Sequence, residues 1–104
     1  MYLARFSYDV LPVNRERAIE FIQREIEAAR RDGLQARLLV PLTRGHGGAA
    51  LQFEVELSNL DQLHQVRHRG GPGEDAAELM RAFSEILVGP PTVEILRVDE
   101  APEP

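Results

Sequence analysis

Residues 49–57 alternate between apolar and polar side chains, and no other stretch constrains the fold as strongly. The apolar side chains fall on one side of an extended chain: Ala49, Leu51, Phe53, Val55 and Leu57. The other side carries one small and three polar residues: Ala50, Gln52, Glu54 and Glu56. A period of two is typical of a β-strand with one buried face. A glycine-rich segment precedes this strand, and Ser58 and Asn59 can cap a helix after it.

The chain before this strand predicts a strand, a helix and a second strand. Residues 2–10 alternate in the same way. Residues 15–32 repeat isoleucine and alanine at steps of three and four, which predicts an amphipathic helix. Asn14 offers its side-chain oxygen as a cap at the start of this helix, and Gly33 suits the left-handed position after its end. Residues 34–42 alternate again, and a proline near their end marks an edge strand.

The chain after residue 57 predicts an interrupted helix and a last strand. A short helix begins after residue 58, and residues 74–87 form a strongly amphipathic segment. Residues 92–98 are rich in β-branched residues and predict the fourth strand. We expect residues 1–98 to form one α+β domain, followed by a disordered acidic, proline-containing tail over residues 99–104.

The order strand, helix, strand, strand, helix, strand predicts a ferredoxin-like βαββαβ sandwich with helices on one face of a four-stranded antiparallel sheet. The first and third strands are expected at its centre. The face away from the helices then carries polar residues: Arg5, Ser7, Asp9, Gln52, Glu54 and Glu56. It also carries three leucines: Leu3, Leu39 and Leu96. An apolar patch on a small sheet indicates a partner, so we expect a two-fold homodimer through this face.

Composition excludes several classes of function. The formal charge of −5 and the pI near 5.1 argue against a nucleic-acid partner or an anionic membrane. The absence of cysteine excludes disulfides, a thiolate nucleophile and a cysteine zinc site. No signal peptide or membrane-spanning run is evident, so we expect a cytoplasmic protein. All twelve basic residues are arginine, which fits the codon bias of a GC-rich bacterium.

Three stretches carry a family resemblance: residues 2–10, residues 55–61 and residues 83–88. With them the chain resembles the dimeric α+β barrel superfamily, in particular the antibiotic biosynthesis monooxygenases and the NIPSNAP-like proteins. The resemblance implies that two domains pair their sheets into a barrel around a semi-polar cavity that binds a small organic molecule. The superfamily spans several chemistries, so the resemblance specifies shape better than activity. The chain has no tryptophan, whereas haem-degrading members carry an Asn-Trp-His constellation, so haem degradation is not expected.

Histidines supply the first group of candidate site residues. His64 and His68 lie four residues apart on a predicted helix, a spacing that allows two imidazoles to share a metal ion. No third ligand is evident, so we predict no metal site and favour an exposed or capping histidine pair over shared metal ligation. We assign His64 to catalysis and His68 to ligand binding. His46, in the glycine-rich connection, is either a base near the barrel mouth or a solvated loop residue.

The strands supply the second group of candidates. Glu54 and Tyr8 are assigned to catalysis, and Arg5, Phe6 and Gln52 to ligand binding. Glu54 and Glu56, with Asp9 and Arg5 on the neighbouring strand, could form a partly buried charged cluster. Its pKa values would be perturbed, as those of active-site residues often are. The alternative is a structural cross-strand ion pair of Arg5 and Glu54 on a wet or interfacial face, which contributes roughly 0.2–1 kcal/mol.

The leading hypothesis is a homodimeric barrel that binds a small organic molecule between sheet and helices. Whether it is an enzyme is open, and no cofactor is expected. Chemistry of the cofactor-independent monooxygenase type needs a dry pocket, a base and hydrogen bonds to a developing anion. Phosphate-loop, dinucleotide and G-x-S-x-G motifs are absent from the sequence. The rival hypothesis is a non-catalytic interaction or regulatory module whose sheet face is filled by its partner, without a ligand cavity.

Overall fold

The computed structural model describes residues 1–43, 50–67 and 81–99. The described residues contain one 3₁₀ turn and named helices and strands in this order: β1 (Tyr2–Tyr8), η1 (Pro12–Asn14), α1 (Arg15–Arg31), β2 (Gln35–Leu39), β3 (Leu51–Leu57), α2 (Gln62–Arg67) and β4 (Thr92–Arg97). Residues 81–86 are also helical. The predicted tail beyond residue 99 and the first half of the predicted segment 74–87, residues 74–80, lie outside the described residues.

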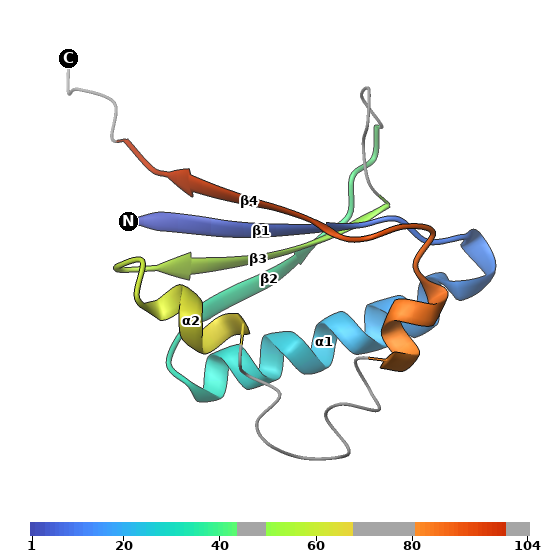
Figure 1. The fold of residues 1–104 in the computed structure, drawn as a ribbon, viewed down its shortest axis with the longest axis horizontal. Helices are drawn as coiled ribbons and strands as arrows, with labels where there is room; N and C mark the ends of the chain where they lie inside the picture. The colour runs from blue at the N-terminus through green and yellow to red at the C-terminus, as the bar shows by residue number, and fades with distance from the viewer. Residues whose placement is uncertain (44–49, 68–80, 100–104) are drawn as a thin grey trace.

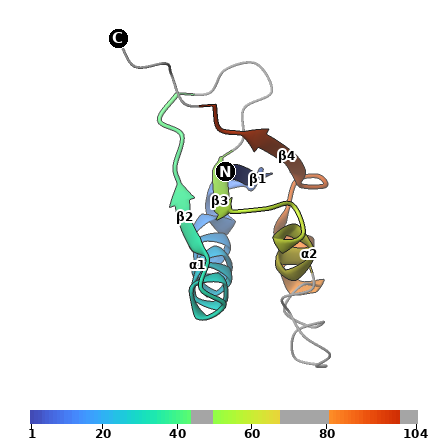
Figure 2. The same cartoon turned by 90° about the vertical axis from the view of Figure 1, so that its left-hand side faces the viewer.

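The four strands form one antiparallel sheet in the order β2-β3-β1-β4. Both named α-helices lie on one side of this sheet (Figures 1 and 2). The predicted α+β ferredoxin-like fold is therefore confirmed, including the central position of the first and third strands. β2 is an edge strand, as the proline after it indicates, and it ends at Leu39 rather than at residue 42.

Helix α1 packs an apolar stripe on the sheet. Its buried residues all belong to the predicted apolar stripe: Ala18, Ile22, Ile26 and Ala29. The helix ends where the sequence indicates, because Gly33 adopts a positive φ of 81° and the Leu34 N–H donates to the Ala29 carbonyl at 2.9 Å. That turn sends the chain directly into β2.

The predicted cap at the start of α1 is wrong. Asn14 makes no side-chain hydrogen bond to the helix. Instead it closes the preceding 3₁₀ turn, where its N–H donates to the Leu11 carbonyl at 2.9 Å, and its φ and ψ of −103° and 2° are not extended as a capping residue requires. Before α2, in contrast, the Asn59 Oδ1 accepts from the Gln62 N–H at 3.2 Å, which confirms the predicted cap there.

The core lies between the helices and the two central strands. On β3 the helix-facing residues Leu51, Phe53, Val55 and Leu57 are at most 1 % exposed. On β1 the residues Ala4 and Tyr8 are buried. β1 ends at Tyr8 rather than at residue 10, although Val10 still forms an isolated bridge with Leu87. β4 is different, because five of its six residues are exposed and one is half-buried.

Candidate functional site

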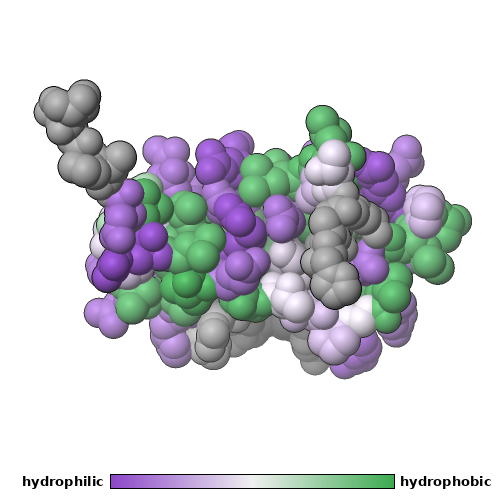
Figure 3. All heavy atoms as spheres, turned by 90° about the horizontal axis from the view of Figure 1, so that it is seen from above, coloured by the Kyte–Doolittle hydropathy of each residue, from purple (hydrophilic) through white to green (hydrophobic). Residues whose placement is uncertain are grey.

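The side of the sheet away from the helices, called here the open face, carries polar and apolar side chains in three cross-strand rows. Direct register pairs define each row. The middle row, called here the charged row, runs from β2 to β4: Arg37, Glu54, Arg5 and Glu94. The rows beside it combine leucines with polar residues: Leu39, Gln52, Ser7 and Thr92 on one side, and Gln35, Glu56, Leu3 and Leu96 on the other. Apolar and polar patches are accordingly interspersed over this side (Figure 3).

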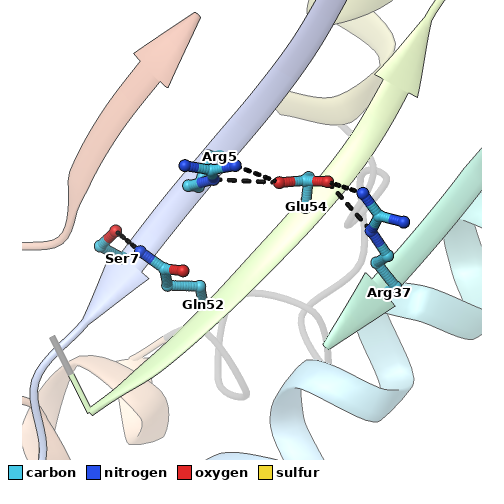
Figure 4. Close-up of polar contacts among 5 residues, drawn as sticks. All are labelled: Arg5, Ser7, Arg37, Gln52 and Glu54. Carbon is cyan, nitrogen blue, oxygen red and sulfur yellow. Dashed lines mark hydrogen bonds and ion pairs between the residues drawn. The ribbon is translucent and has the colours of Figure 1, made fainter. Parts of the chain in front are cut away.

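Glu54 is at the centre of the charged row, between two arginines on the neighbouring strands (Figure 4). The Arg5 Nε and Nη2 donate to Glu54 Oε2 at 3.0 and 2.8 Å. The Arg37 Nε donates to Glu54 Oε1 at 3.0 Å, and the Arg37 Nη2 also donates to that oxygen. The predicted cross-strand contact between Arg5 and Glu54 is therefore present. The second arginine ties β2 to the same carboxylate.

The two guanidinium groups keep a buried carboxylate ionised. The Glu54 side chain is only 1 % exposed, whereas the side chains of Arg5 and Arg37 are 31 % and 60 % exposed. Burial alone would raise the pKa of Glu54, but the hydrogen bonds and positive charges of Arg37 and Arg5 together lower it below the ordinary value. The hydrogen bond to Glu54 raises the pKa of Arg37 in turn. A carboxylate with both oxygens engaged and a lowered pKa is a weak base near neutral pH.

Two smaller features lie beside the charged row. The Gln52 Nε2 donates to Ser7 Oγ at 3.2 Å, so this candidate residue contacts β1 across the sheet (Figure 4). At the β2 edge, an open recess of about 230 Å³ is lined by Arg30, Gln35, Ala36, Arg37, Glu54 and Glu56. Arg5, Gln52 and Glu54 therefore share one surface.

Tyr8 and Phe6 lie on the opposite side of the sheet from Glu54. Tyr8 is buried, and its ring lies 5.0 Å from that of Phe83. Phe83 also stacks on Phe21 of α1 at 5.0 Å. Phe6 is half-buried and stacks on Phe53 at 5.6 Å. The structure thus divides the candidates between two surfaces that the sheet separates.

On the helix side, β4 leaves an apolar strip uncovered. The register places Val93 beside Phe6 and Ile95 beside Ala4. Val93 is 44 % exposed and Ile95 is 39 % exposed, although both point to the side that the helices cover. We call Phe6, Val93 and Ile95 the apolar strip. The sequence did not reveal this exposure, since a run of valine, isoleucine and leucine is equally typical of a buried strand.

The histidine candidates are only partly placed. His64 lies on α2 and is exposed. His46 and His68 fall outside the described residues. Among the residues that the structure describes, no group of three or more histidine, cysteine, aspartate or glutamate side chains could hold a metal ion. The described part of the chain also contains no helix that meets the length and hydropathy needed to cross a membrane.

Comparison with solved structures places this arrangement among known folds. An antibiotic biosynthesis monooxygenase superposes with a TM-score of 0.69 at 15 % identity, over 98 % of this chain and 100 % of that chain. The protein Rv0793 from Mycobacterium tuberculosis superposes with a TM-score of 0.70 at 20 % identity, over 98 % of this chain and 100 % of that chain. The chain has the fold of these proteins. A proposed antibiotic biosynthesis monooxygenase from Deinococcus radiodurans superposes with a TM-score of 0.71 at 11 % identity, over 99 % of this chain and 97 % of that chain.

At these identities the likeness concerns the fold alone. No protein-family model matches the chain, and no curated protein matches it either. The predicted resemblance to the antibiotic biosynthesis monooxygenases is thus confirmed at the level of the fold, whereas the resemblance to the NIPSNAP-like proteins stays a prediction.

Proposed function

We propose that the chain is a homodimeric barrel protein that binds a small, largely apolar organic molecule between its sheet and its helices. The open faces of two sheets form the dimer interface, and the apolar strip contributes one wall of the ligand site. The assembly and the ligand are separate parts of this proposal, and each has its own test.

The exposure of the apolar strip is the observation that carries the ligand site. Val93 and Ile95 lie on the side of the sheet where the core is formed, yet each exposes more than a third of its surface. Contiguous exposed apolar side chains next to a core are typical of a binding site, because burial of that surface by a ligand is favourable. The half-buried ring of Phe6 lies beside them and suits a planar partner.

The leucines of the open face support the dimer. Leu3, Leu39 and Leu96 are each half-buried, and they flank the charged row on both sides. A second sheet packed on this face would bury them together with the two partly exposed arginines. Stable specific interfaces bury about 1,200–2,000 Å² in total, and a four-stranded sheet is a suitable platform for one.

Monooxygenase-like chemistry without a cofactor is the finer part of the proposal. The names of the similar solved structures suggest this chemistry. It requires a dry site in which a phenolic or enolic substrate loses a proton. The catalytic roles of His64, Tyr8 and Glu54 stay predictions. Of these, Glu54 is the least suited to accept a proton, because both of its oxygens already accept hydrogen bonds from arginine.

A thermal-shift screen with planar phenols and quinols tests the ligand site. We expect at least one compound to raise the Tm of the wild-type chain and Val93→Asn to abolish that rise. Val13→Asn is the matched control, because Val13 is an exposed valine in η1, outside the sheet. An equal rise of Tm with the compound in the two variants would exclude the apolar strip as the ligand site. Oxygen consumption in the presence of a compound that binds would support monooxygenase-like activity. Binding without oxygen consumption would support a ligand-binding protein without that activity.

A non-catalytic interaction module is the second candidate. It is favoured by the engagement of both Glu54 oxygens, since paired arginine and glutamate side chains occupy the centre of the open face. A dimer that responds to none of the screened compounds would support this second candidate.

A further inference from the structure

We infer that the charged row sets the direction of the two-fold axis in the dimer, so that Arg37 of each protomer faces Glu94 of the partner subunit. This inference rests on the proposed dimer and adds the orientation of its two sheets. It also gives Glu94 a role in assembly, which neither the fold nor the comparisons assign.

The signs of the charges alternate across the sheet. From β2 to β4 the row reads Arg37, Glu54, Arg5, Glu94, which is positive, negative, positive, negative. A row of four alternating charges has opposite signs at its two ends. It is therefore complementary to a copy of itself that runs in the reverse order.

A two-fold axis parallel to the strands, over the middle of the sheet, produces this reversal. It places β2 of one protomer over β4 of the other and β3 over β1, so Arg37 meets Glu94 and Glu54 meets Arg5. An axis perpendicular to the strands, over the charged row, places every residue of that row over its own copy, so Arg37 meets Arg37 and Glu94 meets Glu94. Like charges that face each other across an interface disfavour the second arrangement.

The groups at the two ends of the row are available for such contacts. The Arg37 side chain is 60 % exposed although it binds Glu54. Glu94 is exposed and makes no ion pair with any other residue that the structure describes. Packed sheets lie about 10 Å apart, a gap that an arginine and a glutamate can span from opposite sides. A rotation of about 30° between packed sheets moves the ends of the row by only a few ångströms.

The net charge of the three bonded side chains in the row supplies a further reason. Arg5 and Arg37 both bind Glu54, and together the three side chains carry one positive charge in excess. Two such groups buried face to face would repel each other, because desolvated like charges are costly. Glu94 from the partner subunit removes this excess on both sides of the interface.

Charge exchange at the two ends of the row tests the inference. We expect Glu94→Arg to weaken dimerisation by roughly tenfold or more, because it turns two attractive contacts per dimer into repulsive ones. The control Glu27→Arg makes the same change of charge on an exposed residue of α1 and should leave the dimer unchanged. The dissociation constants are measured by sedimentation equilibrium, after circular dichroism has confirmed that each variant folds.

A mixing experiment provides the second arm. The Arg37→Glu variant alone should also form a weakened homodimer. An equimolar mixture of the Arg37→Glu and Glu94→Arg variants should form a heterodimer, because each end of one charged row then faces the opposite charge on the other. High salt should strengthen self-association of Glu94→Arg, since it screens the new repulsion. If Arg37→Glu proves too unstable to use, the salt response of Glu94→Arg decides alone.

The outcomes separate this inference from the proposed function. A wild-type dimer that Glu94→Arg does not weaken would overturn the axis direction but leave the dimer standing. A wild-type monomer would overturn both. A weakened Glu94→Arg dimer that regains its affinity in salt or in the mixture would support the inference.

Discussion

Strands β3 and β4 both pair with β1 and both carry alternating apolar side chains, yet they have opposite exposures. On β3 the helix-facing Val55 is fully buried, and even Glu54 on the open face is 1 % exposed. On β4 the helix-facing Val93 is 44 % exposed. Burial in this fold thus depends on the position of a strand in the sheet rather than on its sequence pattern. The residues of β3 are buried or half-buried within one chain, whereas β4 keeps exposed apolar and charged side chains that the proposed ligand and the proposed partner would cover.

The largest expected difference between the two strands is in apolar packing. Val55→Ala should lower the free energy of unfolding by about 2–3 kcal/mol, because it removes fully buried methyl groups and leaves a cavity. Val93→Ala should lower it by less than about 1 kcal/mol, because much of that side chain is already in water. Denaturant unfolding of both variants at one protein concentration measures the difference. Equal losses would contradict the contrast between the strands.

The next difference concerns the charges on β3. Glu54→Gln should destabilise the fold by about 2 kcal/mol, because two arginines lose a buried charged acceptor. The control Glu56→Gln lies on the same face of the same strand but is half-buried, so it should change stability by less than about 0.5 kcal/mol. A Glu54→Gln variant with unchanged or raised stability that no longer responds to ligand would instead assign Glu54 to a binding site.

The lowered pKa of Glu54 predicts a pH dependence with a definite sign. The stability that Glu54 contributes is fully present above the ordinary glutamate pKa of about 4.3 and is lost as the pH falls through the lower pKa of the folded state. The difference in unfolding free energy between wild type and Glu54→Gln should therefore shrink in acid. Unfolding titrations between neutral pH and pH 3 measure it. A difference that stays constant would show that ionisation of Glu54 does not stabilise the fold.

The smallest effect is expected for the ion pair at the end of β4. Arg97 binds Asp99 through two hydrogen bonds of 2.8 and 3.0 Å, but both side chains are about 70 % exposed. Asp99→Asn should change the unfolding free energy by less than about 0.5 kcal/mol, since exposed pairs are screened by water. A loss as large as that of Glu54→Gln would mean that burial is not what distinguishes the two ion pairs.

Much of the fold could be predicted because local signals agreed with each other. The alternation on residues 49–57, the stripe on α1 and the left-handed Gly33 each specify one element and one buried face. The element order then leaves few topologies. The contact between Arg5 and Glu54 is one of two interpretations that the sequence leaves open, and the register of the two central strands places these residues opposite each other.

The remaining features depend on contacts that no local pattern encodes. The alternation of residues 34–42 puts Arg37 on the same face as Leu39, but its contact with Glu54 depends on the register of β2 against β3, which a long glycine-rich connection leaves open. Asn14 does not cap α1, because the 3₁₀ turn before the helix holds its backbone in a conformation that is not extended. The alternation of β1 accounts for the division of the candidate residues between two sides of the sheet. The sequence pattern of β4 does not account for the exposure of its side chains, because that exposure depends on how the helices pack on the sheet.

The mass of the wild-type protein in solution tests the account most directly. If β4 and the open face are completed by a second copy, sedimentation equilibrium at micromolar concentration should give twice the chain mass of 11.7 kDa. A species of one chain mass at that concentration would contradict the dimer, and with it the role given to Glu94.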